Sequence, residues 1–327
     1  MTDPDSWVLA VDLGGTRLRM AVVTPAGELL YEEQHPTPKT RPDILAQIWA
    51  LLDRGRDWVA AQGKGLRGIG ISTGGRVDFE RGEVVDATAL LPDWRRVPLR
   101  DLTVEHLGLP TWVDNDGNCA ALGELWFGAG QDCHHFLSVV VGTGIGGGVV
   151  LDRQVLRGVA GTAGELGHIS VDYQGPVCPC GNWGCVELFA SGSGLANLAQ
   201  TLWEAGVLQF THKTITSATE ITAREVGEAA RLGNPVAQDL IQRAGRILGT
   251  ALTSLLHTLN PERVIVGGTV LDLGEDYWQP LVNTVQSRAM APAPLVRSPL
   301  REAGLLGAAA LVWQNGASEG IKPPQSP

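Results

Sequence analysis

The 327-residue sequence has little basic charge and no long apolar run. Its 25 lysines and arginines are outnumbered by 35 aspartates and glutamates, so the formal net charge is −10. A negative surface repels phosphate backbones and anionic membranes. The longest uncharged apolar stretch, residues 136–151, has sixteen residues, and five of them are glycines. A membrane helix needs about 20 apolar residues. We therefore expect neither nucleic acid nor a membrane as a partner.

The sequence also lacks a disulfide framework, a signal peptide and a P-loop. Five cysteines are an odd number, and three of them lie within eight positions. The first five residues carry two aspartates where a signal peptide would carry basic residues. These absences favour a cytoplasmic protein. No Gly-x₄-Gly-Lys-Ser/Thr segment is present, which excludes a P-loop nucleotide site.

Glycine, with 42 residues, is abundant, and three glycine-rich turns directly follow apolar strands. Such turns let backbone N–H groups approach phosphate oxygens closely. For any single turn, a tight hairpin without a ligand explains the glycines equally well. Three together favour a nucleotide cleft between two halves. Because the first two turns are each followed by another apolar strand, we also predict an internal duplication. The turns are Gly14-Gly15-Thr16, Gly142–Gly148 and Gly267-Gly268.

Apolar periodicity predicts several long helices between these strands. One helix after a strand at 109–113 would cover residues 119–127, with Asn118 or Asp116 as its N-cap. A shorter strand is predicted at 66–71. The other predicted helices are 42–62, 186–210, 222–232, 234–259 and 304–314.

Three consecutive polar residues, Asp114, Asn115 and Asp116, lie where a strand gives way to a helix. Ligands bind at the carboxyl ends of strands in open α/β sheets. A carboxylate there could take a proton from a substrate hydroxyl, and an amide could bind the same substrate. Helix capping needs only one of the three residues and explains the pattern equally well.

The sharpest chemical signal is a cluster of three cysteines and one histidine. His168, Cys178, Cys180 and Cys185 match the Cys₃His ligand set of zinc sites. Because no carboxylate stands at ligand spacing, we expect a structural zinc ion. Glu165 and Glu187 bracket the loop, which would position them to bind sugar hydroxyls. Taken alone, each glutamate is most simply a surface charge.

Several motifs together resemble the ROK family of sugar kinases and repressors. They are Asp12–Thr16 (DLGGT), Glu165–His168 (ELGH) and Cys178–Glu187 (CPCGNWGCVE). Three further segments are similar to the N-acetylmannosamine kinase domain of the animal bifunctional epimerase/kinase, namely Ser72–Val77, Val113–Ala121 and Gly142–Gly148. The resemblance covers residues 7–314.

This resemblance implies an actin/hexokinase-like, ribonuclease H-like, two-domain α/β ATPase fold with duplicated mixed sheets and an interdomain cleft. The small N-terminal domain would comprise residues 1–116 plus about 302–315. The large zinc-containing domain would comprise residues 117–301, followed by a disordered tail at 316–327. The resemblance also implies a homodimer or homotetramer.

The resemblance further implies a role for each matched residue. Asp116 would be the catalytic base for the 6-hydroxyl, and Asp12 would act near Mg²⁺. His168 would place one ring nitrogen on zinc and the other on the sugar. The sugar hydroxyls would be held by Asn115, Glu165, His168 and Glu187, and the sugar pocket would be completed by Gly75, Arg76 and Thr88. The ATP phosphates would contact Gly14, Gly15, Thr16, Thr143 and Gly144, and the nucleoside would contact Gly267 and Gly268.

The implied function is an ATP-dependent kinase for an N-acetylhexosamine, with N-acetyl-D-mannosamine as the preferred sugar. Glucokinase is the alternative. Many ROK glucokinases have Pro-Gly where this chain has Gly74-Gly75, and Asn-Leu-Pro where it has Leu90-Leu91-Pro92. A non-catalytic, sugar-responsive regulator is a third possibility. ROK repressors carry a helix-turn-helix segment before the first glycine turn, whereas only eleven residues precede Asp12 here.

Overall fold

The computed structural model describes residues 6–87, 90–211 and 213–316. These residues form two compact units, one with residues up to 138, 147–164 and from 298, and the other with residues 139–146 and 165–297. We call them unit 1 and unit 2. Residues 317–327 of the predicted tail lie outside the described residues.

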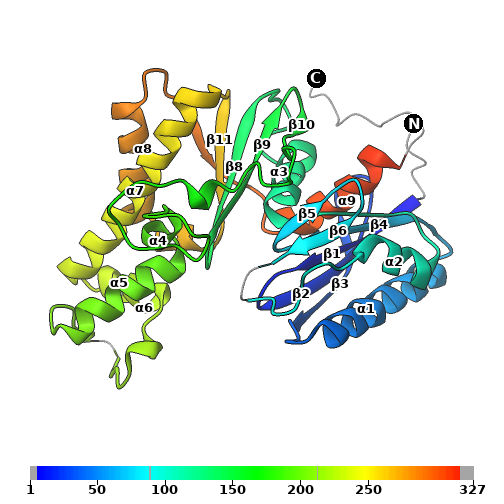
Figure 1. Ribbon diagram of the computed structural model, residues 1–327, viewed down its shortest axis with the longest axis horizontal. Coiled ribbons are helices and arrows are strands. Elements are labelled where there is room, and N and C mark those ends of the chain that lie inside the picture. The colour runs from blue at the N-terminus through cyan, green and yellow to red at the C-terminus, as the bar shows by residue number, and fades with distance from the viewer. Residues whose placement is uncertain (1–5, 88–89, 212, 317–327) are drawn as a thin grey trace. The chain divides into compact units, whose positions relative to one another are not determined.

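A five-stranded mixed sheet organises unit 1, in the order β3-β2-β1-β4-β7 (Figure 1). The strands β1, β2 and β3 pair in antiparallel fashion, whereas β1–β4 and β4–β7 are parallel. A separate hairpin, β5–β6, follows β4. The bounds are β1 Ser6–Leu13, β2 Arg17–Val23, β3 Leu29–Pro36, β4 Gly65–Thr73, β5 Arg76–Asp78, β6 Glu83–Asp86 and β7 Thr111–Asn115.

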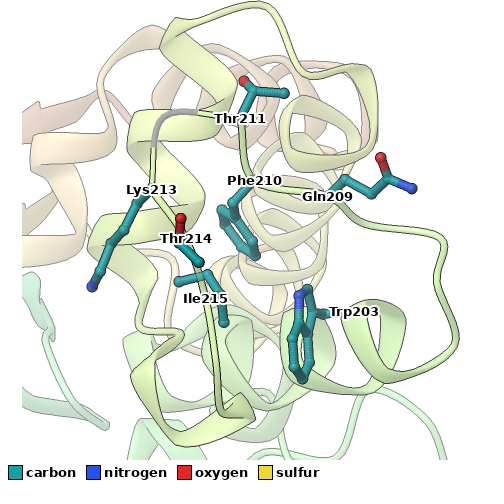
Figure 2. A pocket seen from close by; sticks show the side chains of 7 residues that line it. All are labelled: Trp203, Gln209, Phe210, Thr211, Lys213, Thr214 and Ile215. Carbon is teal, nitrogen blue, oxygen red and sulfur yellow. The ribbon is translucent and has the colours of Figure 1, made fainter.

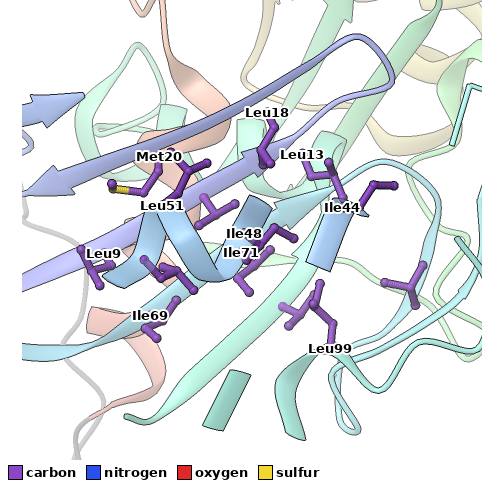
Figure 3. Close-up of a cluster of buried hydrophobic side chains, with 14 of the residues drawn as sticks. Leu9, Leu13, Leu18, Met20, Ile44, Ile48, Leu51, Ile69, Ile71 and Leu99 are labelled. Carbon is purple, nitrogen blue, oxygen red and sulfur yellow. The ribbon is translucent and has the colours of Figure 1, made fainter. Parts of the chain in front are cut away.

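Helices cover both faces of this sheet. On one face, α1 (Arg41–Ala61) buries Ile44, Ile48 and Leu51 against alternate residues of β1 and β2 (Figure 3). Each fully buried side chain of this size contributes about 1.5–3 kcal/mol. On the other face, α9 (Ala303–Asn315) packs so closely on β4 that a Cβ at Gly70 would overlap the carbonyl of Ala308. The remaining helices of unit 1 are α2 Leu99–Leu107 and α3 Asp116–Phe127.

A second five-stranded sheet repeats the first, with the order β10-β9-β8-β11-β12. In each sheet the first three strands lie in the order third, second, first, and two later strands follow. The third strand is antiparallel to the second in both, and the last two strands are parallel in both. This repeat confirms the predicted duplication. The bounds are β8 Phe136–Val141, β9 Ile145–Leu151, β10 Gln154–Val155, β11 Arg263–Gly267 and β12 Leu295–Arg297.

Helices make up most of unit 2. The predicted helices at 222–232 and 234–259 are α6 and α7, but the predicted helix 186–210 is broken at Ser191. That residue has extended backbone, and its side chain accepts a hydrogen bond from Gly194 N to cap a new helix. The sequence analysis also missed α8, which contains a proline. The bounds are α4 Glu187–Ala190, α5 Gly192–Glu204, α6 Ala223–Arg231, α7 Pro235–Leu259 and α8 Glu275–Arg288, with short 3₁₀ helices at Leu166–His168, Ala218–Glu220 and Thr269–Leu273.

No helix within the described ranges combines the length and apolar character that crossing a membrane requires.

Candidate functional site

At the junction between β7 and α3, one residue caps the helix and the next residue is the predicted catalytic base. Asn115, rather than Asn118 or Asp116, is the N-cap of α3, because its Oδ1 accepts hydrogen bonds from the backbone N–H groups of Gly117 and Asn118. Asp116 is therefore the first residue of the helix. Its Oδ1 accepts from Gly117 N at 2.9 Å and from Asn115 Nδ2 at 3.0 Å. Both bonds orient the carboxylate, and a helix N-terminus favours its negative charge.

The other carboxylate oxygen of Asp116 faces Gly74. A Cβ built at Gly74 would lie 3.7 Å from Asp116 Oδ2, which is an ordinary van der Waals distance. The next residue, Gly75, has a φ of 102°, and a Cβ there would come within 2.4 Å of the carbonyl oxygen of Asp86. Gly75 is thus required by its backbone conformation and its neighbours, whereas a Cβ at Gly74 would make only ordinary van der Waals contacts.

Arg76 does not extend alone into solvent. Its Nη2 donates to Asp86 Oδ2 at 2.5 Å across the β5–β6 hairpin, and this hydrogen bond raises the pKa of Arg76. A pocket of about 380 Å³ within unit 1 is lined by Asp86, Ala87, Leu91, Pro92, Asp93, Trp94 and Arg95. Thr88, predicted together with Gly75 and Arg76 for the sugar pocket, lies outside the described residues. The sequence analysis missed Asp86, since no motif marks it.

Asp12, the last residue but one of β1, lies in a polar network. Its Oδ1 accepts from Ser72 Oγ at 2.8 Å, and Arg19 Nη2 lies 3.8 Å from Oδ2. Arg19 is also paired with Glu302. Burial raises the pKa of Asp12. A Cβ at Gly304 would come within 3.1 Å of this carboxylate, so glycine keeps the space beside it clear. A carboxylate is a ligand type that suits Mg²⁺, which prefers oxygen ligands.

The first glycine turn is a tight hairpin between β1 and β2. Gly14 N donates to Arg17 O at 2.9 Å, and Thr37 Oγ1 donates to Gly14 O at 2.7 Å. Lys39 Nζ adds a bond of 3.2 Å to the carbonyl of Gly15. The side chains of Thr37 and Lys39, which follow β3, therefore hold the turn in place through its carbonyl groups.

In unit 2, the second glycine turn is closed by Glu187. Glu187 Oε2 accepts from Ile145 N at 2.7 Å, and a Cβ at Gly144 would lie 2.4 Å from the same oxygen. The start of α5 holds the turn as well, because Gly192 N donates to Gly142 O and Ser193 N to Thr143 O. The structure thus joins a residue predicted for sugar binding to a turn predicted for phosphate binding.

The third turn follows β11. Gly268 has a φ of 99°, and a Cβ there would come within 2.3 Å of the carbonyl oxygen of Val141 on β8. Glycine is therefore required for β11 to end beside β8.

The four predicted zinc ligands lie together, with their ligand atoms within 4.8 Å of one another. Around a tetrahedral zinc ion, bonds of about 2.3 Å to sulfur and 2.0–2.1 Å to nitrogen place two sulfurs about 3.8 Å apart and a sulfur and a nitrogen about 3.6 Å apart. The observed separations are 3.7 Å for Cys180 Sγ–Cys185 Sγ and 3.6 Å for Cys178 Sγ–His168 Nδ1. The donor set therefore fits a structural zinc ion.

The cysteine loop joins the segment that contains Glu165 and His168 to the segment that contains Glu187. His168 directs Nδ1 to the cysteines, while its Nε2 lies 3.9 Å from Glu165 Oε2. Val186 N donates to Ile169 O, which ties the segment before Glu187 to the segment after His168. Gly167 packs on the glycine turn, since a Cβ there would overlap the carbonyl of Ile145.

The predicted site residues thus form two groups. Unit 1 contains Asp12, Gly14, Gly15, Thr16, Gly75, Arg76, Asn115 and Asp116, and unit 2 contains Thr143, Gly144, Glu165, His168, Cys178, Cys180, Cys185, Glu187, Gly267 and Gly268.

A further pocket of about 410 Å³ in unit 2 contains none of these residues. Figure 2 shows Trp203, Phe210 and Lys213 among the side chains that line it, at the end of α5 and in the loop that follows. Because residue 212 of this loop lies outside the described residues, we assign the pocket no role.

Comparison with known proteins identifies the family. A family model described as "ROK family" matches residues 8–315. The chain belongs to the ROK family. Among its relatives, a glucokinase of Halalkalibacterium halodurans is 36% identical over 295 residues, covering 88% of this chain and 87% of the relative. A xylose repressor of Caldicellulosiruptor bescii is 31% identical over 284 residues, covering 86% of this chain and 70% of the relative.

Solved structures of ROK proteins share the fold. A glucokinase from Streptomyces griseus, solved with glucose and AMPPNP, is 34% identical, with a TM-score of 0.81 and coverage of 94% of this chain and 99% of that chain. A Listeria monocytogenes protein titled "a putative N-acetylmannosamine kinase" is 26% identical, with a TM-score of 0.80 and coverage of 95% and 100%. The mixed α/β architecture with two sheets is therefore that of ROK hexokinase-like proteins.

Proposed function

We propose that this ROK protein is an ATP-dependent hexose kinase that phosphorylates a sugar 6-hydroxyl, with glucose as its preferred acceptor. The observation that carries the proposal is the placement of Asp116. Its carboxylate stands at the start of α3, oriented by Asn115 and Gly117, with Oδ2 next to Gly74. Because Asn115 is the N-cap of α3, capping does not account for the carboxylate at position 116.

In the proposed reaction, the sugar 6-oxygen bonds to the γ-phosphorus, and the bond from this phosphorus to the ADP oxygen breaks. The hydroxyl proton passes to Asp116. Asn115, Glu165, His168 and Glu187 would hold the sugar. Gly14–Thr16 and Thr143–Gly144 would lie against the phosphates, and Gly267-Gly268 would lie against the nucleoside. Mg²⁺, held near Asp12, would neutralise phosphate charge.

Zinc has a separate, structural role in this proposal. His168, Cys178, Cys180 and Cys185 would hold it. By joining the segments around His168 and Val186, the loop would keep Glu165 and Glu187 in place. The domain boundaries at residues 116 and 301 and the homodimer or homotetramer stay predictions.

Two observations support glucose over N-acetylmannosamine, reversing the order expected from sequence. Relatives of 33–36% identity are named glucokinases. Arg76, expected to complete the sugar pocket, has its guanidinium paired with Asp86. N-Acetylmannosamine remains a second candidate because Gly74, next to Asp116, presents no side chain to a sugar substituent.

An ADP-release assay over hexoses and N-acetylhexosamines tests the proposal, with Gly74→Ala as the informative variant. Its Cβ would make only ordinary contacts, so the variant should fold. If glucose is preferred, kcat/KM should be highest for glucose and change less than about threefold in the variant. If an acetamido group lies next to Gly74, the variant should selectively lower kcat/KM for N-acetylmannosamine, about 10-fold or more. Sugar binding without ADP release from any sugar would instead indicate a regulator.

A further inference from the structure

A buried ion pair lies behind the turn that carries Asp116. Asp114, on β7, is 1% exposed, and its Oδ2 accepts a hydrogen bond of 2.8 Å from Arg157 Nε and lies 2.8 Å from Arg157 Nη2 in the ion pair. Arg157 follows β10 and is 22% exposed. Charge-assisted hydrogen bonds of this length are among the strongest in proteins.

The second oxygen of Asp114 binds residues on either side of Asp116. Asp114 Oδ1 accepts from Asn115 N at 2.8 Å and from Asn118 Nδ2 at 3.0 Å. Asn115 in turn donates through Nδ2 to Asp116 Oδ1. A continuous chain of hydrogen bonds thus runs from the Arg157 guanidinium to the Asp116 carboxylate.

Arg157 also contacts the β5–β6 hairpin. Its guanidinium carbon lies 3.7 Å from the centre of the Phe79 ring, a cation–π arrangement. Phe79 stands in the turn of the hairpin that begins with Arg76. The Arg157 side chain therefore contacts both the strand end that precedes Asp116 and the hairpin that contains Arg76.

We propose that Arg157 is a positioning residue for phosphoryl transfer, which holds the Asp116 carboxylate in line through Asp114 and Asn115. This inference rests on the proposed kinase function. Lysine cannot replace arginine here, because it offers no paired Nε and Nη2 donors and no planar surface to stack on Phe79. A displacement of about 1 Å in a catalytic group can cost about 100-fold in rate.

Variants that separate stability from positioning test this role. Arg157→Met alone leaves a buried carboxylate without its partner and should lower the melting temperature strongly. Asp114→Asn combined with Arg157→Met removes both charges, and Arg157→Lys keeps the positive charge. Arg100→Met is the matched control, because Arg100 donates its side-chain hydrogen bonds to the carbonyls of Phe79 and Glu80, in the turn of the same hairpin.

We expect the double variant to regain most of the melting temperature lost in Arg157→Met while its kcat stays at least 10-fold below wild type. Arg157→Lys should fold and show a lower kcat with KM for ATP within about twofold of wild type, and Arg100→Met should keep its kcat. Recovery of wild-type kcat in the double variant, or wild-type kcat in Arg157→Lys, would show a purely structural role. A wild-type protein that binds sugar but releases no ADP would overturn the kinase proposal and this inference together, whereas an active wild type with active variants overturns this inference alone.

Discussion

At the residue scale, Asp116 is the side chain on which the proposed chemistry depends. Its Oδ1 is already held by Gly117 N and Asn115 Nδ2, and an asparagine in its place keeps an oxygen acceptor at that position. Asp116→Asn should therefore preserve the helix start and sugar binding. Because the amide cannot accept the proton, kcat should fall about 10²–10⁴-fold.

Steady-state kinetics with calorimetric sugar binding measures both effects. Asp101→Asn is a matched control, since Asp101 also stands in the first turn of a helix, α2. A variant at position 116 that retains more than half of the wild-type kcat would refute the assignment of the base.

Gly144 offers a second test at this scale. An alanine there would place its Cβ 2.4 Å from Glu187 Oε2 and displace the carboxylate from Ile145 N. We expect Gly144→Ala to raise KM for the sugar about 10-fold or more, since a hydrogen bond to a charged group contributes about 1.5–3 kcal/mol.

Gly146→Ala is the control for this substitution, because no atom lies within 4 Å of the Cβ it would add. Its sugar KM should stay within about twofold of wild type. Equal kinetics for the two variants would mean that Glu187 does not link the turn to sugar binding.

At the scale of elements, unit 1 depends on close packing of α9 against β4. Gly70 allows this approach, because a Cβ would lie only 1.7 Å from the carbonyl oxygen of Ala308. Backbone atoms on both sides leave little freedom to relax. Gly70→Ala should therefore lower the free energy of unfolding by about 1–3 kcal/mol, as overpacked sites typically do.

Denaturant unfolding of the purified variants measures this loss. Gly65→Ala, at the start of the same strand, adds a Cβ with no atom within 4 Å and should change stability by less than about 0.5 kcal/mol. Equal stability of Gly70→Ala and Gly65→Ala would contradict the close approach of α9 to β4 at Gly70.

At the scale of the whole molecule, the cysteine loop, with the predicted zinc ligands His168, Cys178, Cys180 and Cys185, lies entirely in unit 2. Metal binding and local folding are linked, so removing zinc with a chelator should loosen the segments joined by the loop. We expect faster amide hydrogen exchange at residues 142–146 and 165–190 of unit 2. The strands β1 and β4 of unit 1 should keep their protection.

Hydrogen-exchange mass spectrometry with metal analysis tests this expectation. The purified protein should hold one zinc per chain, and Cys178→Ser should reproduce the exchange pattern of the chelated protein. Cys133→Ser, at a buried thiol outside the cluster, is the control. Folded and active protein without zinc, or equal loss of protection in both units, would contradict the assigned role.

The sequence by itself determined the repeat, the helices α1, α6, α7 and α9, and the candidate ligands. Glycines after apolar strands, apolar periodicity in α1 and α7, and cysteine spacing are local signals, each arising from the backbone and a few neighbours. The zinc cluster could be predicted because its cysteines are close in sequence and one histidine completes the set.

Only the tertiary structure decided what these residues contact. Asp86 pairs with Arg76, Glu187 binds the backbone of Ile145, and Arg157 pairs with Asp114 from 43 positions away. The helix break at Ser191 and the need for glycine at position 75 likewise depend on neighbours or backbone angles that no periodicity reports. Such partners lie far apart in the chain or in no motif, and folding alone brings their atoms within hydrogen-bonding distance. The pairing of Arg76 with Asp86 is likewise visible only in the structure, and the proposal that glucose is preferred uses it.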